Sequence, residues 1–530
     1  MYTLHAPRDW FRRTLILPLL LLALGGCASL PAVDREAIAS EAIALSPQTT
    51  LGRIASSYQP EALQSGFRLM PLGGFSLDTR IELARRAQVS LDVQYYHFED
   101  DETGRWLLRA MRDAAQRGVR VRLLIDDFYT SGHDELFLAF AAHPNVEVRL
   151  FNPFTVLRNS GQAMRFISAV GDWKRVNHRM HNKLFIADGA MAVIGGRNVA
   201  NEYFLRSASE NFIDVDAFVV GFLLGPLQGL FDRYWNADAV YPLMRIVSPG
   251  EDAAELRRRF EEWTGAAKTP PPPSLPANDL LGYGPIRDDL DGGRLGLIWA
   301  EAYTFADHPD KPFDGEAGGE LQDTSVTYNV FEALRKAQTE LVITSPYMVP
   351  GVEGMKMLRE LAARKVRLVT LTNSLSATDE PVVHLGYRIY RESMLDLGVD
   401  MYEISPSRTK RNLRHKLFAS SLGRLHSKTA VIDRKSVYIG SMNLDPRSAS
   451  INTELGAVID SPQLAREMLR IIDVDRLQSS YRVTRKPGGG LFWAGVEGDQ
   501  EMVYEEEPEV SMWLRLKLFL LAPLIPEALL

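Results

Sequence analysis

The chain has 530 residues, of which 46% are hydrophobic and 24% are charged, and its formal net charge is -7. This length exceeds one ordinary core and favours two large domains or three smaller ones, while the composition excludes disordered and fibrous proteins. The acidic excess argues against a large non-specific nucleic-acid footprint and against simple electrostatic attraction to anionic lipid, so a membrane contact has to be apolar or covalent.

The amino terminus has the features of a secretory signal. Arg12 and Arg13 precede an apolar run at residues 15–24, which is too short for a membrane span. An uncleaved signal anchor is the alternative interpretation. Cys27 is the only cysteine of the chain, so it cannot form an internal disulfide.

The stretch Leu24-Gly25-Gly26-Cys27 resembles the lipobox of bacterial lipoproteins. The resemblance implies that residues 1–26 are a signal peptide, that the chain is cut before Cys27, and that this cysteine is lipidated. Several acyl chains together make the stable anchor that one chain does not. We therefore expect a tether over residues 27–65 and a mature chain in the bacterial cell envelope, lipid-anchored and facing the periplasm. The choice between inner and outer membrane stays open.

Residues 67–243 form a first predicted α/β region. Residues 89–98 and 119–128 have the character of strands, and a helical pattern connects them. Strand, helix and strand make a βαβ unit, which predicts a mixed or parallel sheet covered by helices. We place a first domain at residues 66–245.

A linker zone and a second α/β region follow. The proline-rich residues 269–279 cannot lie inside a sheet, and residues 308–323 have a loop-like composition, so we place the linker zone at residues 246–322. A strand at residues 340–350, a helix and a further strand then repeat the element order of the first region. This repetition indicates an internal duplication and places a second domain at residues 323–490.

Residues 491–530 form a C-terminal tail. Its last part, residues 511–530, is rich in Trp, Leu and Phe, but Arg515, Lys517 and two prolines interrupt it and exclude a transmembrane helix. The segment either packs on the second domain or rests on a lipid surface as an interfacial element.

Two polar motifs, one in each region, share the same spacing. The first is HNKLFIADGAMAVIGGRN at residues 181–198, and the second is HSKTAVIDRKSVYIGSMN at residues 426–443. One copy alone is weak evidence for a catalytic site, but the complete polar frame in both halves is strong evidence. The corresponding positions are His181 and His426, Lys183 and Lys428, Asp188 and Asp433, Gly195-Gly196 and Gly440-Ser441, and Asn198 and Asn443.

The spacing of each motif has a physical meaning. Each motif begins as a predicted strand, in which residues two apart share a face, so the histidine and the lysine project together. The aspartate turns the chain into a returning strand that ends in small residues, where backbone N–H groups can approach an anion. If the halves pack about a pseudo-twofold axis, two histidines, two lysines and two asparagines converge. That set fits a phosphodiester.

The duplicated His-x-Lys-x4-Asp frame with its trailing Gly-Gly/Ser-x-Asn resembles the phospholipase D superfamily. The resemblance covers both halves and implies an α/β fold of two similar α-β-α sandwich domains packed about a pseudo-twofold axis. It implies a reaction without metal or cofactor, in which one histidine forms a phosphohistidine and the other protonates the leaving alkoxide. By analogy, His181 is the nucleophile and His426 is the general acid and base.

The resemblance also implies the remaining residues of the site. Glu454 is expected to orient His181, and Asp214 to orient His426 by fixing its tautomer, with Asp216 as the competing choice for the second role. The residues expected to hold the phosphate are Lys183, Lys428, Asn198 and Asn443. The motif residues expected to be structural are Asp188, Asp433, Gly195, Gly196, Gly440 and Ser441.

Four stretches make the chain similar to the bacterial cardiolipin synthase C subgroup, namely MHNKLFIADG, SPYMVPG, TNSLSATDEPVVHLGY and GSMNLDPRSASINTELG. The subgroup implies a phosphatidyltransferase acting on membrane phospholipids, with phosphatidylglycerol and phosphatidylethanolamine as expected substrates and with room for an accessory protein. His384 and Tyr387 match this signature. They are expected either to contact a headgroup or to pack within a surface helix.

Three weaker features each have a plain alternative. His178 could pair with His181 at a metal, but no third ligand stands nearby in the sequence. Residues 94–98 are expected in the core and the pocket wall rather than in base stacking. The basic residues 408–416 are expected to form a solvated loop, with contact to phosphate headgroups as the alternative.

Three functions fit these patterns. The first is a transphosphatidylase that forms cardiolipin through a phosphohistidine. The second is hydrolysis of phospholipid or nucleic-acid phosphodiesters by the same residues, although the acidic net charge disfavours nucleic acid. The third is a non-catalytic envelope lipoprotein that binds lipid on a retired enzyme fold, and the two complete motifs argue against it.

Overall fold

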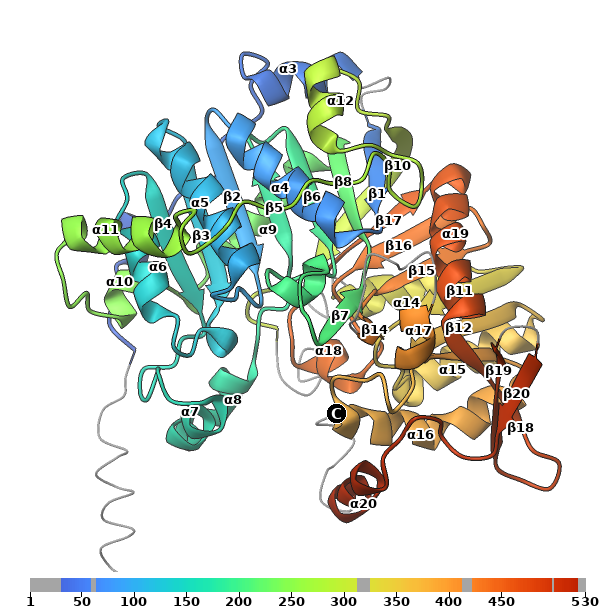
Figure 1. Ribbon diagram of the computed structural model, residues 1–530. Helices are drawn as coiled ribbons and strands as arrows, with labels where there is room; N and C mark the ends of the chain where they lie inside the picture. The colour runs from blue at the N-terminus through green and yellow to red at the C-terminus, as the bar shows by residue number, and fades with distance from the viewer. Residues whose placement is uncertain (1–29, 59–62, 312–324, 412–421, 498–499, 523–530) are drawn as a thin grey trace, which may run out of the picture.

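The computed structural model of the chain describes residues 30–58, 63–311, 325–411, 422–497 and 500–522 (Figure 1). The predicted signal peptide and the predicted lipidation site Cys27 lie outside these ranges. Among the described residues, no helix has the length and apolar character needed to cross a membrane.

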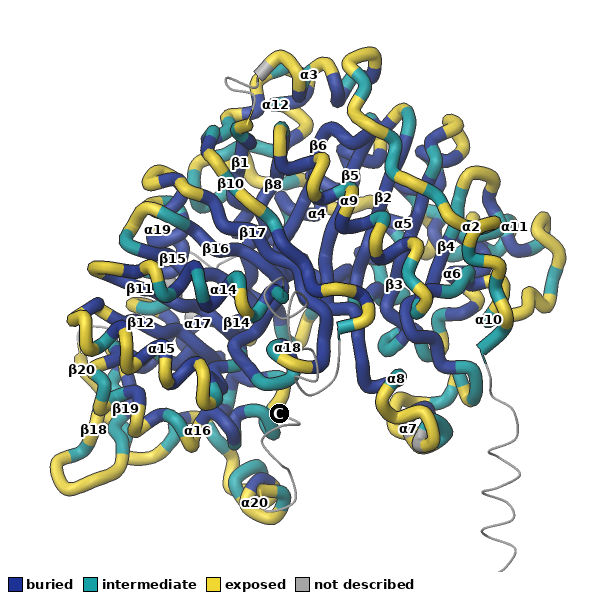
Figure 2. The backbone as a smooth tube through the Cα atoms, turned by 180° about the vertical axis from the view of Figure 1, so that it is seen from behind, coloured by how far each residue is buried: buried dark blue, intermediate teal, exposed yellow. Residues whose placement is uncertain are grey.

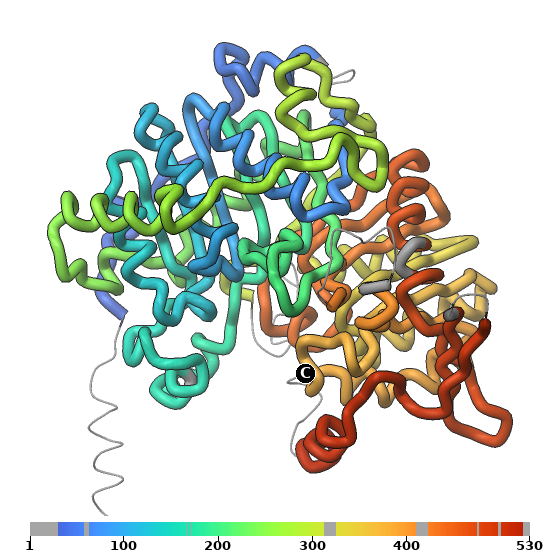
Figure 3. The backbone as a smooth tube through the Cα atoms, in the orientation of Figure 1, coloured from blue at the N-terminus to red at the C-terminus, as the bar shows by residue number. Residues whose placement is uncertain are grey.

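Two halves of the chain fold with the same order of elements, coloured blue to green and yellow to red in Figure 3. The first half contains α2 (Arg35–Ile38), α3 (Thr50–Tyr58), β1 (Ser65–Met70), α4 (Gly73–Arg86), β2 (Ser90–Tyr95), α5 (Glu102–Gln116), β3 (Arg120–Asp126), η1 (Asp127–Tyr129), α6 (Asp134–Ala141), β4 (Val146–Phe151), α7 (Gln162–Ser168), η2 (Val170–Asp172), α8 (Trp173–Asn177), β5 (Leu184–Ala187), β6 (Met191–Gly195), η3 (Asn201–Phe204), β7 (Glu210–Ile213), β8 (Asp216–Gly221), α9 (Leu224–Trp235), β9 (Val240–Pro242), α10 (Leu243–Ile246), α11 (Ala253–Thr264) and α12 (Ile286–Gly292).

The second half begins with a strand that the linker zone supplies. It contains β10 (Ile298–Ala306), α14 (Val326–Arg335), β11 (Glu340–Thr344), α15 (Gly351–Ala363), β12 (Arg367–Asn373), α16 (Pro381–Asp396), β13 (Asp400–Ile404), α17 (Pro406–Arg411), β14 (Leu422–Leu425), β15 (Thr429–Ile432), β16 (Ser436–Gly440), α18 (Pro446–Ser450), β17 (Leu455–Asp460), α19 (Pro462–Gln478), β18 (Ser480–Arg485), β19 (Leu491–Glu497), β20 (Gln500–Tyr504) and α20 (Met512–Leu521).

Each half contains a sheet with the same strand order. The order is β1-β8-β6-β5-β2-β3-β4-β9 in the first half and β10-β17-β16-β15-β11-β12-β13-β18 in the second. The strands that alternate with helices, β2-β3-β4 and β11-β12-β13, run parallel. Strand β10 pairs with β1 through residues 298–300 and with β17 through residues 301–306, so the two sheets are joined into one.

Helices cover both faces of the joined sheet. In the first half, α4, α5 and α6 bury Leu83, Leu107 and Phe137 against one face, and α14, α15 and α16 cover the corresponding face of the second half. The opposite faces carry α9 and α19 and share one apolar cluster, to which Phe231 of the first half and Ile472 of the second both belong. The two α-β-α sandwiches therefore pack through a common core, which confirms the fold expected from the resemblance.

Residues 30–58 do not form a free tether, contrary to the expectation from the sequence. The Ala42 N–H donates to Asp232 of α9 at 2.7 Å, and Arg122 donates to a backbone carbonyl of the segment at 2.9 Å. Leu51 of α3 is fully buried in the core of the first half. Apolar burial and these hydrogen bonds make the segment part of the first half.

The predicted linker zone, residues 246–322, contains regular structure. Its helix α11 packs against α5 and α6, and the Trp106 indole donates to the Pro270 carbonyl at 2.6 Å. The proline-rich residues 269–279 lie outside the sheets, as expected. The zone therefore covers the first half before it enters β10, the strand that both sheets share.

The C-terminal residues extend the second sheet and end in an exposed helix. Strands β18, β19 and β20 continue the sheet beyond β13. Helix α20 then packs against α16, with Leu518 as its buried residue. Residues 523–530 lie outside the described ranges.

Candidate active site

Both motif histidines lie in extended segments just before short strands. Strand β5 begins at Leu184 and β15 begins at Thr429, so the predicted strands are shorter than expected, and the histidines and lysines precede them. Because β5 runs antiparallel to β2, its amino end adjoins the carboxyl end of β2, and β15 has the same relation to β11. Open α/β sheets commonly carry their sites at this end of the strands.

Each histidine is held by the other half of the chain. The His181 N–H donates to the Thr453 carbonyl, and the His426 N–H donates to the Ile213 carbonyl, both at 2.8 Å. Thr453 and Ile213 directly precede the two carboxylate residues of the site. These contacts are equivalent under the duplication, and they make each half incomplete without the other.

The two expected carboxylates contact the two imidazole rings. Nδ1 of His181 lies 2.9 Å from Glu454 Oε2, and Nδ1 of His426 lies 2.8 Å from Asp214 Oδ2. A carboxylate that accepts from Nδ1–H fixes the tautomer in which Nε2 carries no proton. Both rings line the same cavity, so each is set to act there through Nε2.

Asp216, the competing choice for His426, has a different set of partners. Its carboxylate accepts from Ser76 Oγ at 2.6 Å and pairs with Arg80 at 3.0 Å and with Arg197 at 3.3 Å, all in buried surroundings. Burial would raise the pKa of Asp216, but the two guanidinium groups lower it. The structure thus places Asp214 at the imidazole and Asp216 in an ion cluster behind it.

Both lysines lie against their own histidines. Lys183 Nζ donates to the His181 carbonyl at 2.7 Å, and Lys428 Nζ lies 2.9 Å from His426 Nδ1. All four side chains are buried. Burial lowers the pKa of Lys183 well below its ordinary value and that of Lys428 to about 8, and a bound phosphate would compensate the charge of their ammonium forms.

The two asparagines line the same cavity. Asn198 Nδ2 donates to the Tyr203 hydroxyl at 2.9 Å. Asn443 is buried, and its Oδ1 has no hydrogen-bond partner among the described residues. A buried amide with unused capacity beside two histidines is suited to a polar ligand.

Burial dominates the proton affinities of the site. Burial, together with the ammonium groups of the two lysines, lowers the pKa of His181 and of His426 well below the ordinary value. Burial also raises the pKa of Glu454 to about 7 and that of Asp214 to about 7, against the opposing effect of the lysines. Neutral imidazoles are therefore favoured until an anionic ligand adds a compensating charge.

Small residues after the returning strands make room for the carboxylates. A Cβ atom at Gly196 would lie 2.6 Å from Asp214 Oδ2. At the corresponding position of the second half, Ser441 Oγ donates to Glu454 Oε2 at 2.5 Å. Gly195 has a φ of 154°, and a Cβ there would meet the Asp216 carboxylate. The two carboxylates thus have different neighbours. Asp214 lies close to the backbone of Gly196, whereas Glu454 accepts a hydrogen bond from the hydroxyl of Ser441.

The motif aspartates stabilise turns outside the cavity lining. Asp188 accepts from the backbone N–H groups of residues 88–90, and Asp433 accepts from those of residues 338–340. Both aspartates have a φ of 52°, as tight turns between antiparallel strands require. These bonds tie the β5–β6 turn to the start of β2 and the β15–β16 turn to the start of β11.

A cavity of about 600 Å³ contains both histidines in its wall. The ring of Tyr96 lies 4.9 Å from that of His181, and the ring of Tyr203 lies 5.0 Å from that of His426. Further lining residues are His97, Phe128, Tyr129, Trp173, Asn177, Asn198, Glu202, Phe212, Tyr347, Asp379, Glu380, Val382, Val383, Asn443, Asp445, Arg447, Ser448 and Asn452. The wall combines aromatic rings with several carboxylates and one guanidinium group.

Asp379, Glu380 and Arg447 are cavity residues that sequence reasoning did not single out. They stand within two stretches of the subgroup resemblance, TNSLSATDEPVVHLGY and GSMNLDPRSASINTELG. In the sequence, no spacing pattern distinguishes these three residues from ordinary charged surface residues. Their place in the wall depends on how α16 and α18 pack against the first half.

His384 and Tyr387, expected as possible headgroup contacts, are not in the cavity wall. His384 Nε2 lies 2.7 Å from an Arg391 nitrogen, and the Tyr387 hydroxyl donates to Glu403 at 3.0 Å. Glu507 of the tail completes this buried cluster. The structure therefore favours the alternative, a packed helix, and only the first turn of α16 reaches the cavity.

The structure also shows where the weaker candidates from the sequence lie. His178 contacts the backbone carbonyls of Ile451 at 2.7 Å and Pro309 at 2.8 Å. Over the ranges that the structure describes, no group of three or more His, Cys, Asp or Glu residues could hold a metal ion. Tyr95 is in the core, whereas its neighbour in the sequence, Tyr96, is in the cavity wall. Most of the basic run, from residue 412 onward, lies outside the described ranges.

Known proteins are similar to this chain over both of its halves. The family model described as "Cardiolipin synthase, PLD-like domain" matches residues 81–235 and 330–476, once in each half. Cardiolipin synthase C of Escherichia coli (strain K12) is 36% identical over 496 residues, which cover 89% of this chain and 98% of that protein. An uncharacterized protein of Helicobacter pylori (strain ATCC 700392 / 26695) is 30% identical and covers 93% of this chain and 95% of its own length.

A solved structure shares the fold. The crystal structure of phosphatidylserine synthase from Haemophilus influenzae Rd KW20 matches with a TM-score of 0.56 at 14% identity. The match covers 91% of this chain and 100% of the solved chain. The whole two-half architecture therefore recurs in another protein.

Proposed function

This chain belongs to the cardiolipin synthase, PLD-like domain family, and we propose that it is a phospholipid transphosphatidylase that makes cardiolipin. The observation that carries the proposal is the pair of buried histidine–carboxylate contacts, built across the two halves and facing one cavity. Similarity to cardiolipin synthase C over nearly the full length of both chains supports this reaction class.

In the first half-reaction, Nε2 of His181 attacks the phosphorus of a phospholipid donor. A P–N bond forms while the bond from phosphorus to the headgroup oxygen breaks, and His426 gives that oxygen its proton. Glu454 holds the Nδ1 proton of His181 and stabilises the positive charge that develops on the ring. The products are a phosphatidyl–His181 intermediate and a free headgroup alcohol.

In the second half-reaction, the terminal hydroxyl of phosphatidylglycerol is the acceptor. His426, now neutral, takes the proton of this hydroxyl as its oxygen attacks phosphorus and the P–N bond breaks. The transfer forms cardiolipin and returns His181 to its neutral state. Asp214 stabilises the His426 cation at the start and the end of the cycle.

The substrate itself supplies the protonation state that His426 needs. In the protein alone, burial and the ammonium groups of Lys428 and Lys183 lower the pKa of His426. A bound phosphodiester places a negative charge between these lysines and offsets their effect. The lysines, with Asn198 and Asn443, then hold the non-bridging oxygens while His426 becomes able to carry a proton.

The cavity wall offers acceptors for a headgroup. Glu202, Asp379 and Glu380 line the cavity together with the two histidines. Carboxylates accept hydrogen bonds from the hydroxyl groups of a glycerol headgroup and from the ammonium group of ethanolamine. These side chains support phosphatidylglycerol and phosphatidylethanolamine as substrates.

We further propose that lipidated Cys27 anchors the protein to the bacterial envelope, facing the periplasm. Leu30 follows Cys27 by three residues, a span of roughly 11 Å at most, and the residues after it pack on the first half. Such an anchor would hold the body of the protein close to the bilayer. A Cys27→Ser variant is expected to lose incorporation of labelled palmitate, and retention of the label would contradict the proposal.

Lipid analysis in a bacterial host without cardiolipin synthases tests the function. Expression of the chain is expected to produce cardiolipin, while His181→Ala and His426→Ala are expected to produce none, and His384→Gln, outside the cavity wall, serves as the active control. Phosphatidic acid without cardiolipin would identify a hydrolase instead. A folded protein that yields neither product would support the non-catalytic alternative.

A further inference from the structure

Two exposed apolar helices flank the cavity. Figures 1 and 2 show α7 of the first half and α20 of the tail projecting at the same end of the molecule, on either side of the division between the halves. Trp173, at the start of α8, lines the cavity on the α7 side. Val382 and Val383 of α16 line it on the other side, and α20 packs against α16. Each projecting helix therefore neighbours an element that contributes to the cavity wall, α8 beside α7 and α16 beside α20.

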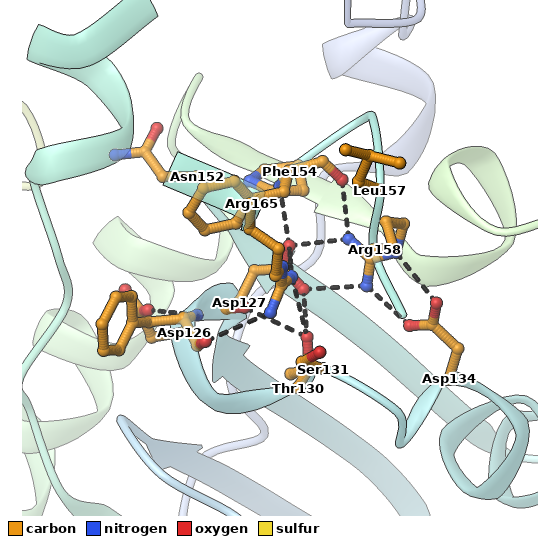
Figure 4. A network of polar contacts seen from close by, with 12 residues as sticks. Asp126, Asp127, Thr130, Ser131, Asp134, Asn152, Phe154, Leu157, Arg158 and Arg165 are labelled. Carbon is orange, nitrogen blue, oxygen red and sulfur yellow. Dashed lines mark hydrogen bonds and ion pairs between the residues drawn. The ribbon is translucent and has the colours of Figure 1, made fainter. Parts of the chain in front are cut away.

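Helix α7 is fastened to the first half by a buried ion cluster. Arg165 of α7 donates to Asp127 Oδ2 at 2.9 Å, and Arg158 donates to the same carboxylate at 2.6 Å (Figure 4). Burial would raise the pKa of Asp127, but the two guanidinium groups lower it. With Arg165 turned inward, Met164 and Ile167 face solvent and are 49% and 61% exposed.

Helix α20 also turns apolar side chains to solvent. Leu518 is its buried residue, and Arg515 forms an ion pair with Glu506 at its base. Trp513 and Phe519 are 73% and 77% exposed. The other exposed apolar residues of the helix are Met512, Leu516 and Leu520. Exposed apolar groups gathered in this way mark a contact surface.

An exposed lysine lies beside the exposed apolar residues on each side of the cavity. Lys174 follows Trp173 on α8, and Lys517 lies between the apolar residues of α20. Tryptophan and lysine beside aliphatic residues are typical of the boundary between phospholipid headgroups and acyl chains. Because the whole chain has a net charge of -7, binding there depends on apolar insertion with local lysine–phosphate contacts.

We propose that α7 and α20 together form a bilayer-docking surface that seats the cavity on the phospholipid headgroups. This surface rests on the proposed function, because a donor and an acceptor whose acyl chains stay in the bilayer reach the histidines only from the membrane surface. A protein partner that covered both helices would cover the cavity between them as well. A bilayer covers the same helices and supplies both substrates.

Site-specific fluorescence tests where the protein meets the bilayer. Cys27→Ser removes the only cysteine and the predicted lipidation, so Phe519→Cys, Ile167→Cys and Leu63→Cys can each carry a single NBD probe on the full chain. Leu63 is 65% exposed and lies in the chain between α3 and β1. Because α3 lies at the end of the molecule opposite to α7 and α20 in Figure 1, position 63 is the matched control. With vesicles of phosphatidylethanolamine and phosphatidylglycerol, emission at positions 519 and 167 is expected to rise at least threefold and that at position 63 to stay constant. Constant emission at 519 and 167, or an equal rise at 63, would overturn the proposal.

A second measurement separates docking from catalysis. In the Cys27→Ser chain, Trp513→Ser with Phe519→Ser is expected to weaken vesicle binding at least tenfold, while turnover of a water-soluble short-chain phospholipid stays within twofold. The control, Leu63→Ser with Phe222→Ser, is expected to change neither quantity. Unchanged vesicle affinity, or a loss of self-association in place of vesicle binding, would overturn the docking surface. Absence of short-chain turnover in the parent would instead count against the proposed function.

Discussion

Asp214 and Asp216 stand two residues apart, and Asp214→Asn tests whether only the first serves the reaction. Asp214 Oδ2 lies 2.8 Å from His426 Nδ1, and both groups are buried. A hydrogen bond to a charged group contributes about 1.5–3 kcal/mol, which corresponds to a factor of roughly 10 to 150 in rate. An amide that turns its NH₂ group toward the ring also selects the wrong imidazole tautomer and adds to the loss. We expect kcat for cardiolipin formation to fall by at least this factor.

Asp216→Asn is the matched control for this prediction. Its carboxylate pairs with Arg80 and Arg197 in buried surroundings, and removing one partner of a buried ion pair costs about 3–5 kcal/mol. This variant is expected to lose that stability in urea denaturation while its folded fraction keeps a kcat near the parent value. A parent-like kcat in Asp214→Asn, together with a large loss of kcat in folded Asp216→Asn, would refute the assignment.

Three further predictions concern the surroundings of the site. Gly196→Ala places a Cβ 2.6 Å from Asp214 Oδ2, so kcat is expected to fall at least tenfold, and parent-like turnover would contradict the close packing. Burial and Arg391 lower the pKa of His384 to about 4 from 6.5, so this residue stabilises the fold above pH 6.5 and that stability is lost as the pH falls to 4. Relative to His384→Gln, the parent is expected to lose up to about 3 kcal/mol over this window, and parallel pH profiles in urea denaturation would contradict it. Asp433→Ala removes the acceptor for the N–H groups of residues 338–340 and is expected to cost about 1 kcal/mol of stability with KM unchanged, so a raised KM would contradict its structural role.

Hydrophobic patterns and the repeated motifs were sufficient to predict two α/β halves, because the helices and parallel strands form from local sequence. Strand β10 was not predicted, since its place is defined by pairing with β1 and β17, which are far away in the chain. The segment at residues 30–58 was missed for a related reason. Its helices are short, and helices of this length gain their stability from tertiary contacts rather than from their own residues.

The motif spacing was sufficient to predict that the histidines, lysines and asparagines of the two motifs lie close together. It was sufficient although β5 and β15 are shorter than predicted. The choice between Asp214 and Asp216 did not follow, because residues two apart in an extended segment share a face. What separates them is Arg80, which is more than 100 residues away in the chain and forms its ion pair with Asp216 rather than with Asp214. In the same way, His384 lies outside the cavity wall and contacts Glu507 of the tail. Because Glu507 is more than 100 residues away in the chain, no local sequence pattern predicts this contact.

Trapping of the covalent intermediate tests the central claim most directly, namely that His181 receives the phosphatidyl group while His426 moves the proton. The purified protein is mixed with a donor that carries radioactive phosphorus, quenched within one turnover, and mapped by mass spectrometry of its peptides. We predict an acid-labile phosphatidyl group on His181 in the parent and none in His181→Ala. Label on His426, or turnover by the parent with no covalent label at any time, would contradict it.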